Sequence, residues 1–224
     1  MGVLLLIRHG RTQANVDGIL AGRTPGVMLD EHGIATVTEL GSRLEEVSIA
    51  HVVTSPLERT RQTASIAFSQ NIPISDDDRL LECDYGQWQG KLLKELAEDP
   101  LWKVVQQRPD EMIFPDGESM TQMSRRAVTA VREWDEKLSA EHGPDVIWAA
   151  VSHGDIIKAI CADALGMPLN KFQKIVIDPA SISVIQYSQN GSSVAKLNDT
   201  GTQWLSTLRK VAPQLGGQSG KDED

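Results

Sequence analysis

Short apolar runs and longer amphipathic segments alternate along most of the chain. Residues 3–7 are apolar without interruption, which is typical of a strand buried on both faces of a sheet. Between residues 33 and 47 the apolar positions follow helical spacing and predict a helix. Val52 and Val53 predict a second strand, and residues 57–68, which begin just after Pro56, predict a second helix.

The C-terminal half continues this alternation. Ser119 and Gln122 fit a capping box, which predicts a long helix that runs from there towards residue 138. Residues 146–151 form the most apolar run of this half and predict a strand. Residues 156–165 continue from it as a helix.

Three shorter features complete the prediction. Residues 72–74 indicate a further strand, and the irregular stretch 76–115 contains one short helix near residues 92–98. Two segments near the C-terminus predict an antiparallel hairpin around a turn with Asn190-Gly191, and these are residues 181–187 and 193–197.

Strands that alternate with helices predict an α/β fold. We expect a three-layer sandwich with a mainly parallel sheet and helices on both faces, formed by one domain over residues 1–212. Residues 213–224 are rich in Gly and charged residues and are expected to form a disordered tail. Polar clusters follow Ile7, Val53 and Val151, at the ends of three predicted strands. Because sites in such sheets lie at the carboxyl ends of strands, these clusters are the first candidates for function.

Composition and charge narrow the classes of function. A net charge of −9 argues against broad binding to nucleic acid or to an anionic membrane, although a basic pocket inside an acidic shell stays open. The only cysteines, Cys83 and Cys161, do not imply a disulfide framework, so we expect a reducing, cytoplasmic location. The apolar N-terminal run ends at Arg8, too early to span a bilayer, and it lacks the features of a signal peptide. A homodimer is the prior expectation for the oligomeric state.

Arg8-His9-Gly10 directly follows the first predicted strand. Gly10 would allow the backbone to come close to a ligand, while neutral imidazole is a competent nucleophile. The guanidinium of Arg8 could grip phosphate oxygens as a rigid fork. On its own, however, this tripeptide fits a surface Arg-His pair at a strand end at least as well.

Two further clusters strengthen a phosphate site. Arg59 and Arg61 lie early in the second predicted helix, where a phosphate would gain from the helix dipole, and Ser55-Pro56 places Arg59 in the first turn. His153-Gly154 repeats the pattern of His9-Gly10 at another strand end. Two histidines could share one phosphoryl group or bind a metal. We assign no metal, because no further histidine or carboxylate pair lies at ligand spacing.

Five segments together resemble the histidine phosphatase superfamily, the phosphoglycerate mutase-like proteins. They occur in family order and cover most of the chain from residue 3 to about residue 190: Leu6-Ile7-Arg8-His9-Gly10-Arg11-Thr12 with Asn15, Ser55-Pro56-Leu57-Glu58-Arg59-Thr60-Arg61-Gln62-Thr63-Ala64, Leu81-Glu82-Cys83-Asp84-Tyr85-Gly86-Gln87-Trp88-Gln89-Gly90, Pro115-Asp116-Gly117-Glu118-Ser119 and Val151-Ser152-His153-Gly154. The resemblance implies a phosphoglycerate mutase-like fold and phosphoryl transfer without a metal or another cofactor.

The resemblance also implies catalytic roles. His9 would attack the phosphorus and form a phosphohistidine, which water then hydrolyses. Arg8, Arg59 and His153 would hold the phosphoryl oxygens and stabilise their charge. Glu82 would protonate the departing oxygen and later take a proton from the attacking water. An ordinary Glu titrates at about 4.3, so this role needs burial or a nearby anion to raise the pKa.

A second group of residues would complete the phosphate site. Asn15 would add a hydrogen bond, and the turn at Ala21-Gly22 would bring backbone N–H groups close to the ligand. Gly154, which follows the second histidine, belongs to the same expected set.

The family contains both phosphatases and mutases, so the fold does not decide between them. Its mutases carry an extended basic insertion after the acid segment, where this chain has only Lys91-Leu92-Leu93-Lys94. Asp155 stands where mutases usually have Asn, and it would repel a substrate carboxylate. We therefore predict a phosphatase for small phosphate monoesters, with specificity set by residues 91–114. A mutase and a non-catalytic phospho-ligand-binding module are the alternatives.

Overall fold

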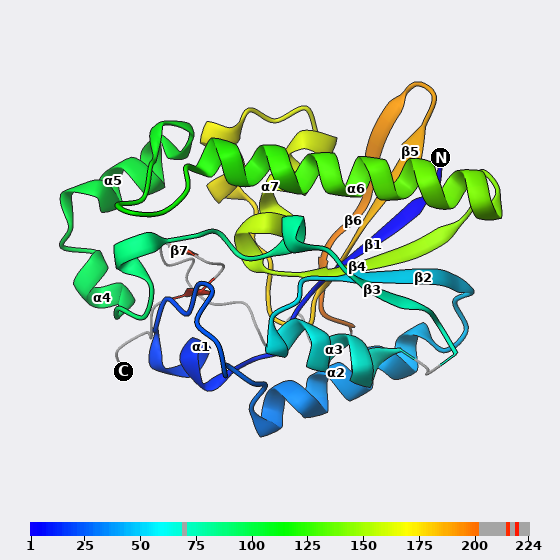
Figure 1. Cartoon of the computed structure of the whole chain (residues 1–224), viewed down its shortest axis with the longest axis horizontal. Helices are drawn as coiled ribbons and strands as arrows, with labels where there is room; N and C mark the ends of the chain where they lie inside the picture. Colours follow the sequence, from blue (N-terminus) through cyan, green and yellow to red (C-terminus); the bar gives the residue numbers. More distant parts are fainter. Residues whose placement is uncertain (69–70, 202–213, 216–217, 220–224) are drawn as a thin grey trace.

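The computed structural model describes residues 1–68, 71–201, 214–215 and 218–219 (Figure 1). Its main sheet has the strand order β3-β2-β4-β1-β5-β6. Strands β3, β2, β4 and β1 run parallel to one another, whereas β5 pairs in an antiparallel arrangement with both β1 and β6. The strands are β1 (Val3–Arg8), β2 (Ile49–Thr54), β3 (Ile74–Asp76), β4 (Ile147–Ser152), β5 (Ile182–Ser188) and β6 (Gly191–Asp199).

Helices cover both faces of this sheet, as Figure 1 shows. One face carries α2 and α3, and the other carries α6 and α7. The helices are α1 (Gln13–Asp17), α2 (Glu31–Leu44), α3 (Glu58–Ala67), α4 (Leu93–Leu96), α5 (Pro100–Gln107), α6 (Met120–His142) and α7 (Gly154–Ala164). Short 3-10 turns are η1 (Asp78–Leu80), η2 (Gly86–Trp88), η3 (Pro109–Glu111) and η4 (Leu169–Lys174). The predicted three-layer α/β fold with a mainly parallel sheet is therefore confirmed.

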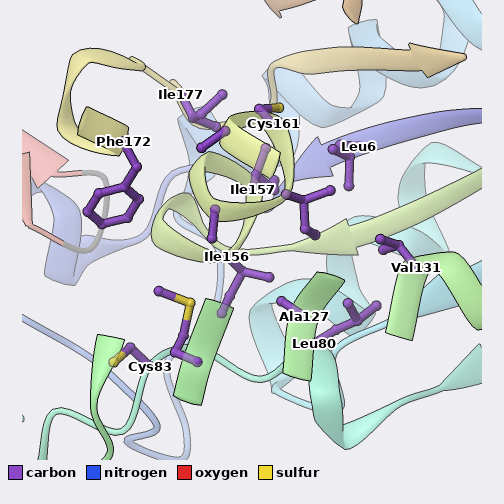
Figure 2. Packing of buried hydrophobic residues seen from close by; sticks show 14 of the residues in the cluster. Leu6, Leu80, Cys83, Ala127, Val131, Ile156, Ile157, Cys161, Phe172 and Ile177 are labelled. Atoms are coloured by element: carbon purple, nitrogen blue, oxygen red, sulfur yellow. The ribbon is translucent and has the colours of Figure 1, made fainter. Parts of the chain in front are cut away.

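The alternation of side chains along β1 divides the interior into two cores. Leu4 and Leu6 join the core beneath α6 and α7, whereas Leu5 and Ile7 join the core beneath α2 and α3. Each buried leucine or isoleucine contributes about 1.5–3 kcal/mol relative to an exposed one, so a strand that is apolar on both faces belongs at the centre of the sheet. In Figure 2 the larger core is seen between β1, α6 and α7.

Most predicted elements are confirmed, with shifted ends. Helix α2 begins two residues earlier than predicted, because the Asp30 side chain accepts a hydrogen bond from the Gly33 N–H and caps it there. The capping box of Ser119 and Gln122 is present, and α6 extends beyond the predicted end to His142. The predicted hairpin is β5 and β6. Helices α1 and α5 were not predicted.

The tail expected at residues 213–224 lies largely outside the described residues. Within it, β7 (Gln214–Leu215) and β8 (Gln218–Ser219) pair in an antiparallel arrangement. Among the helices that the structure describes, none has both the length and the apolar character needed to cross a membrane.

The topology brings three strand ends together. In the sheet, β4 lies between β2 and β1, and all three run in the same direction. The His9 N–H donates to the Ser152 carbonyl, and the Ser55 N–H donates to the Val151 carbonyl. The residues that follow β1 and β2 are thus hydrogen-bonded to the last residues of β4, so the three strands end at one side of the sheet, as predicted.

Candidate active site

Six of the nine predicted site residues line one pocket of about 250 Å³, a volume that includes space open to solvent. The pocket is lined by His9, Thr12, Asn15, Leu20, Ala21, Gly22, Arg59, Glu82 and Tyr85. The other three predicted residues, Arg8, His153 and Gly154, are buried and do not line this pocket. Leu20 is a pocket residue outside every motif, whereas Thr12 and Tyr85 lie in motifs but had no assigned role.

His9 is held in one tautomer by its own backbone. Its Nδ1 lies 2.8 Å from the Gly10 carbonyl oxygen, and because a carbonyl can only accept, Nδ1 carries the proton. Nε2 is then left with its lone pair. Burial, together with the positive charges of Arg59 and Arg8, holds the pKa of His9 well below its usual value. The ring is therefore neutral and nucleophilic at Nε2.

Gly10 was expected to let the backbone approach a ligand, but the structure shows it packed closely against α2. A Cβ at this position would lie 2.7 Å from Val37 Cγ2 and 2.9 Å from the Gly33 carbonyl oxygen, both on α2. Its N–H donates to Thr63 Oγ1 at 3.0 Å. The glycine thus allows the end of β1 to pack closely on a helix, rather than allowing a ligand to approach the backbone.

Arg59 lies in the first turns of α3 and is only 2% exposed. Its Nε donates to His9 Nε2 at 3.3 Å, and its Nη2 donates to the Gly22 carbonyl at 2.7 Å. Nη1 is buried and has no hydrogen-bond partner among the described residues. A buried guanidinium nitrogen without a partner is costly, so it marks the place for an anionic ligand. Arg61, in contrast, lies at the surface and pairs with Asp76.

His153 occupies the N-cap position of α7, directly before Gly154. Its Nδ1 accepts from Arg59 Nη2 at 3.2 Å, and its Nε2 donates to Ser55 Oγ at 2.9 Å. The rings of His153 and His9 meet edge to face with their centroids 5.3 Å apart. Burial and the positive charge of Arg59 hold the pKa of His153 well below its usual value.

Arg8 supports the site from within the sheet. Its Nη1 donates to the Ile177 carbonyl at 2.7 Å. Burial lowers the pKa of Arg8, while the negative charges of Glu82 and Asp178 partly offset that effect. The carbonyls of Arg8 and His9 both accept from the N–H of Ala180, which has a φ of +57°. A constrained loop therefore fixes the backbone of Arg8 and His9.

Glu82 is 3% exposed and lies on the irregular segment between η1 and η2. Its Oε1 accepts from the Cys83 N–H at 3.0 Å. Burial, followed by the negative charge of Asp155, raises the pKa of Glu82 to about 7. At neutral pH such a group can both give and take a proton, which the role implied by the family resemblance needs. Burial also raises the pKa of the Cys83 thiol well above its usual value, so this neighbour stays protonated.

The opposite wall of the pocket comes from α1 and the loop after it. Thr12 caps α1, and Asn15 Oδ1 accepts from the Thr12 N–H at 2.9 Å. This contact leaves the amide nitrogen of Asn15 as the group available to a ligand. Gly22 has a φ of +53°, a conformation that favours glycine, and Ala21 accepts from the Thr24 N–H at 3.0 Å. Ala21, Gly22 and Asn15 therefore all line the pocket, and their contacts with a phosphate stay a prediction.

Asp155 differs from the expectation. It does not line the pocket but is fully buried in the first turn of α7. Its Oδ2 accepts from the Tyr85 hydroxyl at 2.9 Å, and its Oδ1 pairs with Lys158 Nζ at 3.4 Å. Asp155 can therefore influence the site through the effect of its charge on Glu82, but it lies too deep to repel a substrate carboxylate by direct contact.

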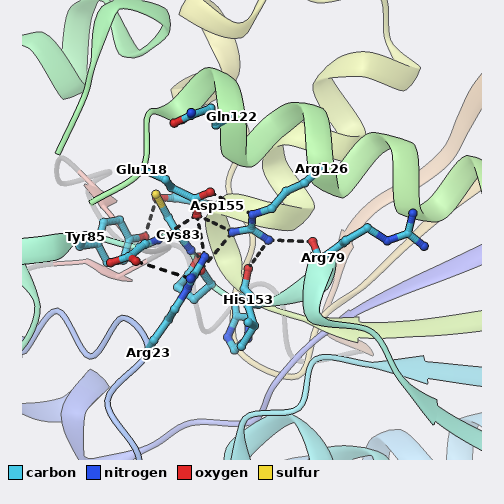
Figure 3. A network of polar contacts seen from close by, with 12 residues as sticks. Arg23, Arg79, Cys83, Tyr85, Glu118, Gln122, Arg126, His153 and Asp155 are labelled. Atoms are coloured by element: carbon cyan, nitrogen blue, oxygen red, sulfur yellow. Dashed lines mark hydrogen bonds and ion pairs between the residues drawn. The ribbon is translucent and has the colours of Figure 1, made fainter. Parts of the chain in front are cut away.

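Glu118 and Arg126 are the main residues that sequence reasoning missed. Figure 3 shows them with Arg23 beside the segment that carries Glu82. Glu118 lies in a recognised motif but had no assigned role, and Arg126 lies outside every motif. Arg126 binds mainly backbone carbonyls far away in the sequence, which leave no pattern in the chain. Glu118 accepts from the Asp84 N–H and from the side chains of Arg23 and Arg126.

The residues that the structure describes contain no group of three or more His, Cys, Asp or Glu side chains placed to hold a metal ion. The metal-independent mechanism remains a prediction that a chelator can test.

Comparisons with known proteins agree with the sequence motifs. The family described as "Histidine phosphatase superfamily (branch 1)" matches residues 4–200. Phosphoserine phosphatase 1 of Hydrogenobacter thermophilus is 30% identical over 204 residues, which cover 88% of this chain and 92% of that protein. A probable phosphoglycerate mutase of Klebsiella pneumoniae is 33% identical over 189 residues, which cover 83% of this chain and 85% of the relative. The solved structure of Bacillus stearothermophilus YhfR superimposes with a TM-score of 0.80 at 30% identity, and covers 89% of this chain and 98% of its own.

Proposed function

The chain belongs to branch 1 of the histidine phosphatase superfamily, and we propose that within this family it is a phosphatase that hydrolyses phosphate monoesters through a phosphohistidine on His9. Family membership itself implies phosphomonoester substrates. The observation that carries the proposal is the joint placement of His9 Nε2, the unpartnered Nη1 of Arg59 and the raised pKa of Glu82 in one pocket.

In the first step the lone pair of His9 Nε2 attacks the phosphorus, and the ester P–O bond breaks. The departing oxygen keeps the bond electrons and takes the proton of Glu82, so a neutral alcohol leaves. Arg59, which lines the pocket, stabilises the phosphoryl oxygens by charge and hydrogen bonds, and the buried Arg8 adds its positive charge. For His153 to donate as well, Nδ1 must take up a proton, which a nearby anionic phosphoryl group favours.

In the second step a water oxygen attacks the phosphorus of the phosphohistidine. The P–N bond breaks, its electrons return to His9 Nε2, and the Glu82 carboxylate takes a proton from the water. Inorganic phosphate leaves, and both residues regain their starting states. A pKa of Glu82 of about 7 suits this exchange, because both protonation states are populated near neutrality.

A phosphoglycerate mutase is the second candidate, favoured by the 33% identical probable mutase. The segment after Glu82 supports the phosphatase instead. It forms the short α4 (Leu93–Leu96) and α5 (Pro100–Gln107) and has no long basic insertion. A phosphatase releases inorganic phosphate steadily, whereas a mutase interconverts 2- and 3-phosphoglycerate without releasing it.

The first experiment measures phosphate release from a panel of monoesters with EDTA present, comparing the wild type with His9→Ala. Phosphoserine and both phosphoglycerates lead the panel, because the names of the relatives point to them. We expect the wild type to release phosphate despite the chelator and His9→Ala to release essentially none. An acid-labile phosphoenzyme should accumulate in a rapid quench of the wild type. Chelator-sensitive release, or appreciable turnover by His9→Ala, contradicts the mechanism.

A further inference from the structure

Glu82 lies on a segment without regular secondary structure, yet the backbone around it is firmly held from α6. Arg126 Nη1 donates to the Arg79 carbonyl at 2.7 Å and to the Leu81 carbonyl at 2.8 Å. Arg126 Nη2 donates to the carbonyl of Glu82 itself at 3.1 Å. One side chain therefore binds three backbone carbonyls within four residues, directly where the chain enters the pocket.

Glu118 fixes the orientation of this guanidinium. Arg126 Nε donates to Glu118 Oε2 at 3.0 Å, and Nη2 donates to Oε1 at 2.6 Å, which is a bidentate pair (Figure 3). Glu118 Oε1 also accepts from the Asp84 N–H at 2.9 Å. Burial tends to raise the pKa of Glu118, but the hydrogen bond and charge of Arg126 lower it overall, so the pair remains ionised.

Arg23 joins this pair to the phosphate side of the pocket. Its Nε donates to the Glu82 carbonyl at 2.9 Å, and its Nη2 donates to Glu118 Oε1 at 3.0 Å. The preceding residue, Gly22, accepts from Arg59 Nη2 at 2.7 Å. The short segment of Gly22 and Arg23 is therefore attached both to the arginine expected to bind phosphate and to the segment that bears the acid.

We propose that Arg126, Glu118 and Arg23 form a clamp that positions Glu82 for proton transfer to the leaving oxygen, with Arg126 as its central positioning residue. The inference rests on the proposed phosphatase function. Proton transfer requires the carboxyl to lie within hydrogen-bond reach of the departing oxygen, and a displacement of 1 Å can cost about 10²-fold in rate. Because Arg126 does not line the pocket, it acts through the Glu82 backbone rather than on the substrate.

A comparison of substrates with poor and good leaving groups distinguishes a displaced Glu82 from a simple loss of protein stability. An alkyl phosphate expels a poor leaving group and needs the proton of Glu82, whereas an activated aryl phosphate needs it little. The ratio kcat/KM reports the steps up to the loss of the leaving group. A variant that displaces Glu82 therefore loses alkyl phosphate activity selectively, whereas a variant that merely lowers the folded fraction loses activity on both substrates equally.

The experiment compares Arg126→Met and Arg126→Lys with the wild type, using kcat/KM for one alkyl and one p-nitrophenyl phosphomonoester. We expect Arg126→Met to lose about 10²-fold or more on the alkyl substrate and less than about tenfold on the aryl substrate. Arg126→Lys should be intermediate, because an ammonium cannot reproduce the fork. Glu82→Gln supplies the reference pattern for loss of the acid.

The matched control is Arg132→Met on the same helix. Arg132 pairs with Asp163 at the surface, and its side chain is 57% exposed. Its replacement should therefore leave the ratio of alkyl to aryl kcat/KM unchanged. If Arg126→Met does not fold, Arg23→Met provides the second test, because Arg23 is 30% exposed and its removal should still shift the alkyl-to-aryl ratio in the same direction.

Equal losses on both substrates in folded Arg126 and Arg23 variants would overturn the clamp. The proposed function fails differently: there the wild type itself releases no phosphate, or His9→Ala remains active. An active wild type with an unchanged alkyl-to-aryl ratio in the variants therefore refutes the clamp alone.

Discussion

At the residue scale, the protonation of Glu82 depends on charged groups from several elements. Asp155 of α7 raises its pKa, while Arg59 of α3 and Arg8 of β1 lower it. Tyr85 also lies in the pocket and donates its hydroxyl to Asp155. Burial has the largest effect and raises the pKa, so Glu82 titrates near neutrality although two guanidinium groups lie close to it.

Replacing Asp155 should therefore move the pH profile. In Asp155→Asn the negative charge that raises the pKa of Glu82 is lost, so that pKa should fall from about 7. In the proposed mechanism, formation of the phosphoenzyme needs protonated Glu82. The alkaline limb of kcat/KM for an alkyl phosphate should therefore move to lower pH. The measurement is the pH dependence of phosphate release, with an aryl phosphate as the insensitive reference.

Lys158→Met provides the opposite case. Lys158 is fully buried and offsets the charge of Asp155 from 3.4 Å, so its removal should raise the pKa of Glu82 and move the alkaline limb to higher pH. Breaking a buried ion pair is destabilising by about 3–5 kcal/mol, so folding of both variants is checked first by circular dichroism. Shifts in the same direction for the two variants would show that Asp155 does not act through its charge.

At the scale of elements, the site depends on how closely α2 approaches the end of β1. A Cβ on Gly33 would lie only 2.1 Å from the Arg11 carbonyl oxygen, a backbone atom that no side-chain rotation can move away. Arg11 is two residues from His9, so this contact fixes the distance between α2 and the segment that carries His9. Glycine is needed here for packing, since its φ lies outside the left-handed region.

Gly33→Ala should force α2 away from β1 and destabilise the protein by roughly 1–3 kcal/mol, as overpacking does elsewhere. Urea unfolding followed by circular dichroism measures the change. Ser42→Ala, at an exposed position on the same helix, is the control and should be neutral or slightly stabilising. An unchanged midpoint in Gly33→Ala would mean that the backbone tolerates a shift of α2.

The elements that sequence reasoning missed are the short ones. Helix α1 has no buried residue, so it shows no hydrophobic periodicity, and only the reciprocal cap of Thr12 and Asn15 marks it. Helix α5 begins with Asp99 as N-cap and Pro100 at N1, which is a recognisable start. Long helices such as α6 were predicted because both a capping box and a repeated apolar face were present.

At the scale of the whole molecule, the site residues that could be predicted are those that come directly after a strand. His9, Ser55 and His153 come directly after β1, β2 and β4, so the topology of a parallel sheet was enough to bring them together. Arg126 could not be found in this way. It lies more than forty residues from the carbonyls that it binds, and a carbonyl is present at every residue.

The raised pKa of Glu82 lowers the free energy of unfolding of the whole molecule at neutral pH, and this effect can be measured. Its pKa is about 7 in the folded state against an ordinary value of 4.5, so the unfolded chain loses this proton first as the pH rises. The folded state is therefore disfavoured increasingly between pH 4.5 and 7, by up to about 3 kcal/mol above pH 7 at 1.36 kcal/mol for each unit.

Glu82→Gln removes this titration. The variant should therefore gain stability relative to the wild type as the pH rises, with a difference between pH 5 and pH 8 of up to about 3 kcal/mol in urea unfolding. Glu39→Gln, on the exposed side of α2, is the matched carboxylate-to-amide control. A constant difference across this range would mean that Glu82 titrates alike in both states. A growing difference would mean that the protein gives up stability to keep an acid available for catalysis near neutral pH.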